Sequence, residues 1–187
     1  MADVIRTHIE GFWPDNLAEY FSWELGPIKS LAPDFRVCRV SPKSPNEPWT
    51  YVSIGASARE LEEYSLEFVL RTAFEDPLFL EVLAMVTHYH LSSEQPFDLG
   101  SLINFGRPWA KDSSCDHFLV SLPYPLGPKL EWLHDEQMPK SNVRFLWLMP
   151  IYANEAAFAR TKGAEALEDL FEEHEIDAID PRRNPVA

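Results

Sequence analysis

The chain has 187 residues, of which 45% are hydrophobic and 13% aromatic, and its formal net charge is −14. A chain of this length and composition can bury its own core, which excludes a largely disordered protein. Residues 1–90 carry 14 acidic and 7 basic side chains and residues 91–187 carry 16 and 9, so the acidity is not confined to a tail. Such an acidic surface repels nucleic acid and attracts basic proteins. The alternative interpretation is that the charge only makes the protein highly soluble.

The cysteines and the apolar runs exclude several kinds of site and of protein. Cys38 and Cys115 form no C-x-x-C pair, so neither a zinc site nor a disulfide scaffold is predicted. The N-terminus lacks the pattern of a signal peptide, and the longest apolar run, near 145–151, is too short to span a bilayer. We therefore expect one cytoplasmic domain, residues 1–187, with no membrane partner.

The first 25 residues are predicted to be helical. Pro14 suits the first turn of a helix, and Trp13, Leu17, Tyr20 and Phe21 then recur at helical spacing. Gly26 and Pro27 would end this helix.

The rest of the chain mixes strands and helices. Alternating or continuous apolar residues predict strands at 35–40, 49–54, 64–71, 117–122 and 143–149. Helical periodicity predicts helices at about 76–89, 154–162 and 164–175. The run from Val143 to Met149 is almost wholly apolar, which is typical of a central strand covered on both faces. The fold class is therefore α+β, with a central mixed or antiparallel sheet flanked by helices.

No catalytic motif is complete. Phosphate-binding glycine loops are absent from the sequence. Gly55-Ala56-Ser57 begins like a nucleophile elbow, but Arg59 stands where the second glycine is needed. Cys115 and His117 have suitable types for a thiol nucleophile, yet positions two apart on a strand lie about 6–7 Å apart, and a buried structural thiol fits better.

Other titratable groups also have structural explanations. His88 and His90 would face together on a strand, but the predicted helix separates them. Glu75, Asp76 and Glu81 suit the first turn of a helix better than acid–base catalysis. We therefore predict no catalytic residue, no metal and no cofactor. An unrecognised hydrolase is the alternative to this prediction.

The last predicted helix has two stripes. One is mainly apolar and includes Leu167, Leu170 and Phe171, while the other is acidic and includes Glu165, Glu168, Asp169 and Glu172. The acidic stripe has two interpretations, a solvated helix face or a docking face for a basic partner.

Several segments, in order, resemble the Suppressor-of-fused (SUFU) domain family, single-domain bacterial type. The resemblance covers about residues 45–184 and is carried by five segments: 48–57 with its apolar-Gly-x-Ser ending, the Glu-apolar strand 64–71, the strand leading to Pro-Ile-Tyr at 143–155, the glycine that opens 163–167, and the Asp-Pro-Arg of 179–183.

The resemblance implies a protein-binding module. Eukaryotic relatives hold a transcription-factor peptide as an added strand, and bacterial relatives are regarded as immunity proteins that neutralise toxins. It implies a peptide-binding role for Asp98, although the family's preceding glycine is Phe97 here. The family's accompanying tyrosine aligns near Val86, with Tyr89 one turn further on, so we do not expect the same peptide to bind.

The expected function is therefore that of an immunity protein, or antitoxin, that binds a basic toxin. Its acidity favours this hypothesis, because an acidic inhibitor is steered towards a basic enzyme. The alternative is a cytoplasmic regulatory or scaffold protein that binds a peptide or a transcription factor.

Overall fold

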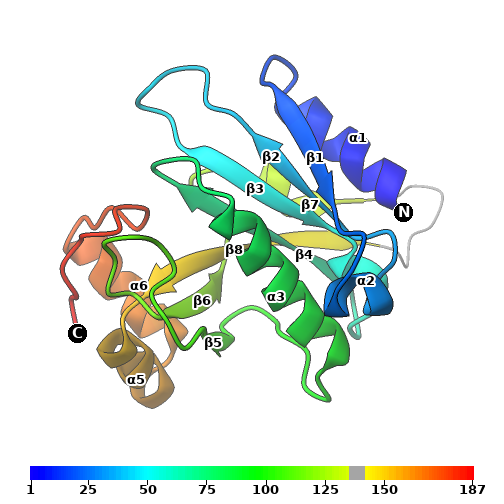
Figure 1. Cartoon of the computed structure of the whole chain (residues 1–187). Helices are drawn as coiled ribbons and strands as arrows, with labels where there is room; N and C mark the ends of the chain where they lie inside the picture. The colour runs from blue at the N-terminus through cyan, green and yellow to red at the C-terminus, as the bar shows by residue number, and fades with distance from the viewer. Residues whose placement is uncertain (135–141) are drawn as a thin grey trace. The chain divides into compact units, whose positions relative to one another are not determined.

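The computed structural model describes residues 1–134 and 142–187 (Figure 1). The chain divides into two compact units, each built from two separate segments. The first unit contains Met1–Phe97 and Leu122–Trp147, and the second contains Asp98–Ser121 and Leu148–Ala187. The organisation of the chain as one domain stays a prediction.

The first unit contains most of the strands. Its elements in chain order are α1 (Ala2–Phe12), β1 (Ala18–Ser22), α2 (Pro27–Leu31), β2 (Arg36–Val40), β3 (Trp49–Ile54), the 3-10 helix η1 (Ala56–Ala58), β4 (Ser65–Thr72), α3 (Leu78–Ser92), α4 (Pro128–Glu131), β7 (Trp132–Leu133) and the first part of β8 (Val143–Ile151). Strands β1 to β4 pair in succession and antiparallel. Strand β4 then pairs with β8 in parallel, and β7 pairs with β8 in antiparallel orientation.

The prediction of one helix over the first 25 residues is wrong. Helix α1 ends at Phe12, and residues 18–22 form β1, which pairs with β2. A proline disfavours helical geometry in the residue before it, so Pro14 ends the helix instead of beginning it. Helix α1 uses a different apolar stripe, in which Ile5 and Ile9 are fully buried.

Helices cover both faces of the sheet in the first unit. Ile5 and Ile9 of α1 share a core cluster with Cys38, Val52 and Phe145. The neighbouring positions of the strands contact α3: Tyr51 of β3 contacts Phe79, and Phe68 of β4 contacts His90. Because successive side chains of a strand point to opposite faces, a strand covered on both sides is apolar at most of its positions. This explains the run of buried residues in β4 and β8.

A fully buried carboxylate organises the turn after β3. Glu67 of β4 accepts hydrogen bonds from the backbone N–H groups of Gly55, Ala56 and Ser57, at 2.8, 3.2 and 3.2 Å, and from the hydroxyl of Ser53. Burial raises the pKa of Glu67, and hydrogen bonds from Ser53, Gly55 and Ser57 act in the opposite direction. Gly55 has a φ of 124°, and a Cβ there would lie 3.3 Å from the backbone of Phe35, so this turn requires glycine.

The second unit combines short strands with two helices. Its elements are β5 (Leu102–Asn104), β6 (His117–Ser121), the last part of β8, α5 (Ala153–Lys162) and α6 (Ala164–Glu173). Strands β5 and β6 pair antiparallel, and α5 packs against α6. The sequence predicts neither a strand nor a helix between residues 90 and 116, because β5 has only three residues and is too brief to show a periodic pattern.

The strand order β1-β2-β3-β4-β8-β6-β5, with β7 beside β8, makes an eight-stranded mixed sheet among the described residues. With its flanking helices this confirms the α+β class. The prediction for Val143–Met149 is also confirmed, since Phe145 and Leu146 are both fully buried in β8. In the part of the chain that the structure describes, no helix has both the length and the hydropathy needed to cross a bilayer.

Candidate functional site

A groove lies between α2 and α3 in the first unit. Gly26 has a φ of 99°, and Pro27 takes the first helical position, so the chain turns sharply from Leu25 into α2. The groove has a volume of about 410 Å³ and is lined mostly by apolar side chains: Trp23, Leu25, Gly26, Pro27, Ile28, Glu81, Ala84, Met85, His88 and Tyr89. Figure 1 shows α2 and α3 side by side in this unit.

Tyr89, predicted to bind a partner, lies on the rim of this groove. Its side chain is 58% exposed, whereas Val86, one turn earlier, is buried. His88 also lines the groove, but His90 is fully buried and its Nδ1 accepts the backbone N–H of Phe97 at 3.1 Å. The helix therefore turns the two histidines in different directions, as the periodicity predicts. A partner-binding role for Tyr89 stays a prediction.

Asp98 lies in the second unit and stabilises a turn. One carboxylate oxygen of Asp98 accepts the backbone N–H of Leu99 at 2.7 Å, and the backbone N–H of Asp98 donates to the hydroxyl of Ser101 at 2.9 Å. Gly100 in this turn lies beside α6, because a Cβ on Gly100 would be 3.8 Å from the Cβ of Ala164. Asp98 is half-buried, so part of its surface stays accessible. Its role in binding stays a prediction.

The acidic stripe of α6 divides into exposed and inward-facing positions. Glu165, Asp169 and Glu172 are exposed at spacings of four and three, which places them in one row. Glu168 is half-buried, and its carboxylate accepts a hydrogen bond from Ser121 of β6. Three of the four predicted residues therefore form a continuous outer surface, while Glu168 contributes to the packing of α6.

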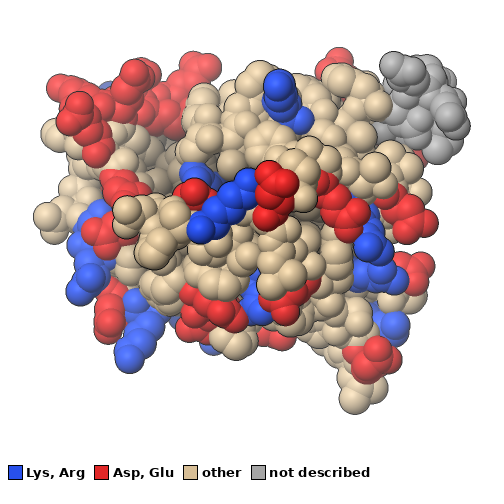
Figure 2. All heavy atoms as spheres, turned by 90° about the horizontal axis from the view of Figure 1, so that it is seen from above, with Lys and Arg blue, Asp and Glu red and all other residues tan. Residues whose placement is uncertain are grey.

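Further exposed acidic side chains lie at the end of α6 and just after it. Glu173, Glu175 and Asp177 are exposed as well, and among the described residues none of the exposed acidic side chains from 165 to 177 forms an ion pair. Figure 2 shows Asp and Glu side chains gathered at its upper left. We name Glu165, Asp169 and Glu172 the acidic row.

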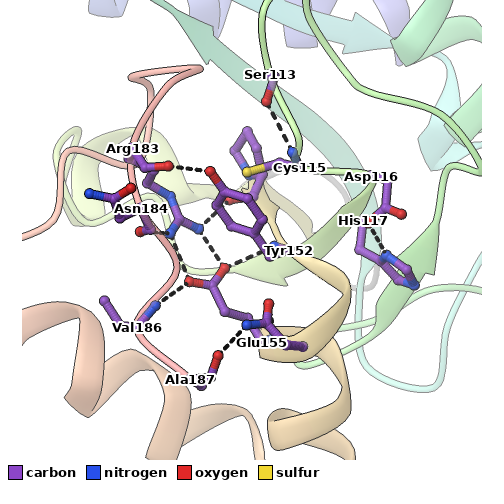
Figure 3. Close-up of polar contacts among 12 residues, drawn as sticks. Ser113, Cys115, Asp116, His117, Tyr152, Glu155, Arg183, Asn184, Val186 and Ala187 are labelled. Carbon is purple, nitrogen blue, oxygen red and sulfur yellow. Dashed lines mark hydrogen bonds and ion pairs between the residues drawn. The ribbon is translucent and has the colours of Figure 1, made fainter.

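A buried ion pair fastens the C-terminal segment to α5 (Figure 3). Arg183 and Glu155 are 7% and 0% exposed, and the guanidinium donates to both carboxylate oxygens, at 2.6 and 2.7 Å. Arg183 also donates to the carbonyl of Pro150 at 3.1 Å, and the backbone N–H of Val186 donates to Glu155 at the same distance. Burial lowers the pKa of Arg183, but its hydrogen bonds and ion pair with Glu155 outweigh burial and raise it.

Tyr152 completes this cluster. The Arg183 guanidinium lies 5.1 Å from the centre of the Tyr152 ring, and the Tyr152 hydroxyl donates to the carbonyl of Arg183 (Figure 3). Both partners lie in segments of the sequence resemblance, Glu155 after Pro-Ile-Tyr and Arg183 directly after the closing Asp-Pro-Arg, but spacing alone does not reveal that they meet. Their contacts hold the C-terminal segment in place and form no accessible site.

Cys115 and His117 do not form an activated thiol nucleophile. Cys115 is 1% exposed, and burial raises the pKa of its thiol to about 11. His117 bonds Asp116 through its Nδ1 at 2.7 Å. Within residues 1–134 and 142–187, no group of three or more His, Cys, Asp or Glu is placed to hold a metal ion.

We expect both cysteines to react slowly with iodoacetamide at pH 8 in the native protein. Only the thiolate reacts, and burial raises the pKa of Cys38 to about 12 and that of Cys115 to about 11. Mass spectrometry should show full labelling in denaturant and little labelling of native protein over the same time. Native labelling of Cys115 faster than that of a free thiol would contradict the prediction and revive a catalytic role.

Comparison with known proteins is consistent with the fold and the motifs. No curated protein matches the chain. A crystal structure described as that of a SUFU homologue from Neisseria gonorrhoeae FA 1090 is 38% identical, with a TM-score of 0.88, and the match covers 100% of this chain and 96% of that chain.

Two more distant structures share the fold. The Sufu-Fu complex matches with 16% identity and a TM-score of 0.71, over 99% of this chain and 91% of that chain. Drosophila Suppressor of Fused matches with 15% identity and a TM-score of 0.74, over 97% of this chain and 50% of that chain. The family model described as Suppressor of fused protein (SUFU) matches residues 32–184, and the chain therefore belongs to the SUFU family.

Proposed function

We propose that this chain binds another protein, and that it is an immunity protein that neutralises a basic toxin. The observation that carries the proposal is the acidic row of α6, whose three carboxylates are exposed on one side of the helix and form no ion pair among the described residues. Family membership supports protein binding, since a related structure is a complex of Sufu with Fu. The net charge of −14 favours a basic partner.

The chemistry of such inhibition is electrostatic and steric. Carboxylates that approach a basic substrate-binding surface replace the negative charges of its substrate, and the bulk of the inhibitor then blocks access. The acidic row would make the first contact, because exposed charges govern the rate of encounter. Co-purification of the chain with the product of the adjacent gene tests the immunity role directly, and recovery of a basic enzyme whose activity falls on binding supports it.

A regulatory peptide-binding function is the second candidate. It is favoured by Asp98, which is half-buried in a turn beside α6 and keeps accessible surface. A captured partner that binds as a peptide, loses affinity on Asp98→Ala and has no toxic activity would support this function over immunity.

We expect the triple variant Glu165→Lys, Asp169→Lys and Glu172→Lys to associate with a basic partner roughly tenfold more slowly at low salt. Charges at the rim of an interface act mainly on the association rate, whereas buried contacts set the dissociation rate. Stopped-flow or surface-binding kinetics at low and high salt measure the effect, and the difference between variant and wild type should shrink as salt rises.

The matched control is the triple variant Glu62→Lys, Glu63→Lys and Glu94→Lys. These glutamates are exposed in the first unit, and their reversal changes the net charge by the same amount. If both triple variants slow association equally, only the net charge matters, and the acidic row is a solvated helix face. An association rate that is indifferent to salt and to both variants rules out steering.

A further inference from the structure

The groove between α2 and α3 belongs to the first unit, whereas the acidic row belongs to the second, and the two also differ in the chemistry of their side chains. Its floor includes Ile28 and Ala84, each 4% exposed, and Met85 lines it as a half-buried side chain. Leu25 and Tyr89 stand on its rim and are 84% and 58% exposed. Leucine and tyrosine exposed beside an apolar groove are typical of a surface that another molecule covers.

The composition of α3 explains why this surface exists. A helix that only covers a sheet has one apolar stripe and one polar stripe. Helix α3 instead buries Phe79, Val82, Leu83 and Val86 and still presents Met85 and Tyr89 on its outer side. Met85 has an unbranched, flexible side chain, which adapts to the shape of an incoming apolar group.

The charges around the groove define the occupant. Among the described residues that line the groove, Glu81 is the only Asp, Glu, Lys or Arg. The indole N–H of Trp23 donates to one carboxylate oxygen of Glu81 at 3.2 Å and thereby holds the side chain beside the groove. The neighbouring Glu24 is exposed, and within the described part of the chain neither glutamate forms an ion pair.

We infer that this groove binds a short segment of a partner protein that places a bulky apolar side chain between α2 and α3 and an arginine or lysine against Glu81. An apolar anchor in a pocket with a charged neighbour is the arrangement that concentrates binding energy at protein interfaces. A second copy of this chain is disfavoured as the occupant, because each copy carries a charge of −14. The inference rests on the proposed protein-binding role, but it does not depend on the acidic row or on a toxin.

Synthetic peptides test the inference without an identified partner. The probe peptide carries adjacent phenylalanine and leucine with an arginine two positions away in an otherwise Gly-Ser chain, and the comparison peptide has glutamate in place of the arginine. We expect the arginine peptide to shift the NMR signals of Trp23, Met85 and Tyr89 and to bind about threefold more tightly than the glutamate peptide, which is the scale of an exposed ion pair.

Two variants separate the apolar contact from the charge. Glu81→Gln keeps an oxygen to accept the Trp23 indole N–H but removes the charge, so it should abolish the preference for arginine, whereas Glu63→Gln, which removes an exposed charge elsewhere, should preserve it. Met85→Ser should weaken both peptides about tenfold, the scale of a lost apolar anchor. Circular dichroism before titration establishes that each variant is folded.

Several outcomes would overturn the inference. Peptide-induced NMR shifts confined to residues outside the groove would contradict binding at this site. An arginine preference that survives Glu81→Gln would contradict the pairing of the basic residue with Glu81. A dimer in sedimentation that Leu25→Ser disperses would show that a second copy fills the groove, and binding of a small apolar dye without binding of either peptide would indicate a small-molecule site. Because these measurements use no basic toxin, their failure is distinguishable from failure of the acidic row to steer association.

Discussion

Replacing Arg183 with methionine is expected to lower the free energy of unfolding by about 3–5 kcal/mol. Methionine fills much of the same space but leaves the fully buried Glu155 carboxylate without its bidentate partner. The carbonyl of Pro150 loses a donor as well. Equilibrium urea denaturation measures the change.

Arg182→Met is the matched control, because Arg182 is the exposed neighbour and the buried ion pair with Glu155 is made by Arg183. We expect it to change stability by about 0.5 kcal/mol or less. The double variant Arg183→Met with Glu155→Gln should recover part of the loss, since it removes the uncompensated charge. Equal stability of wild type and Arg183→Met would show that the buried pair contributes nothing.

Replacing Glu67 with glutamine is expected to lower the free energy of unfolding by about 2–6 kcal/mol. Two buried donors would each lose their acceptor, and each such loss costs about 1–3 kcal/mol. Both carboxylate oxygens of Glu67 accept backbone N–H groups, and the amide NH₂ of glutamine would face donors on one side. The turn 55–57 should therefore loosen as the protein loses stability. Hydrogen exchange at the amides of Gly55, Ala56 and Ser57, together with thermal unfolding, measures both effects.

Glu63→Gln serves as the control for Glu67→Gln, because Glu63 is exposed and removing its charge should leave stability nearly unchanged. Fast amide exchange confined to residues 55–57 in Glu67→Gln would support the role of Glu67 as an acceptor for the turn. An unchanged exchange pattern would contradict it.

Local patterns predict the strands of this fold better than its first helix. The strand prediction at 49–54 matches β3, and the apolar run at 143–149 identifies β8, because a strand buried on both faces has a distinctive composition. The helical spacing of Leu17, Tyr20 and Phe21 misled the prediction because β1 gains its hydrogen bonds from β2, a partner about 20 residues further along the chain. Tertiary pairing overrides a short periodic pattern of this kind.

The candidate surfaces differ in how far the sequence predicts them. The acidic row is visible as a charge stripe, since helical spacing fixes which of its residues share a side. The inward position of Glu168 depends on Ser121 of β6, and the groove depends on how α2 packs against α3, so neither is encoded in one segment. Tyr89 was predicted from a resemblance, and the structure adds its neighbours Trp23 and Met85.

The parallel pairing of β4 with β8 has a consequence for synthesis of the protein. Strand β4 ends at Thr72 and its partner begins at Val143, so residues 73–142 must be made in between, which takes roughly 4–14 s at about 5–20 residues per second. During that interval the apolar strand β4 has an open edge on the ribosome-bound chain. The nascent protein therefore passes through a stage at which it is exposed to strand-to-strand aggregation, and chaperone capture would protect it most during this stage.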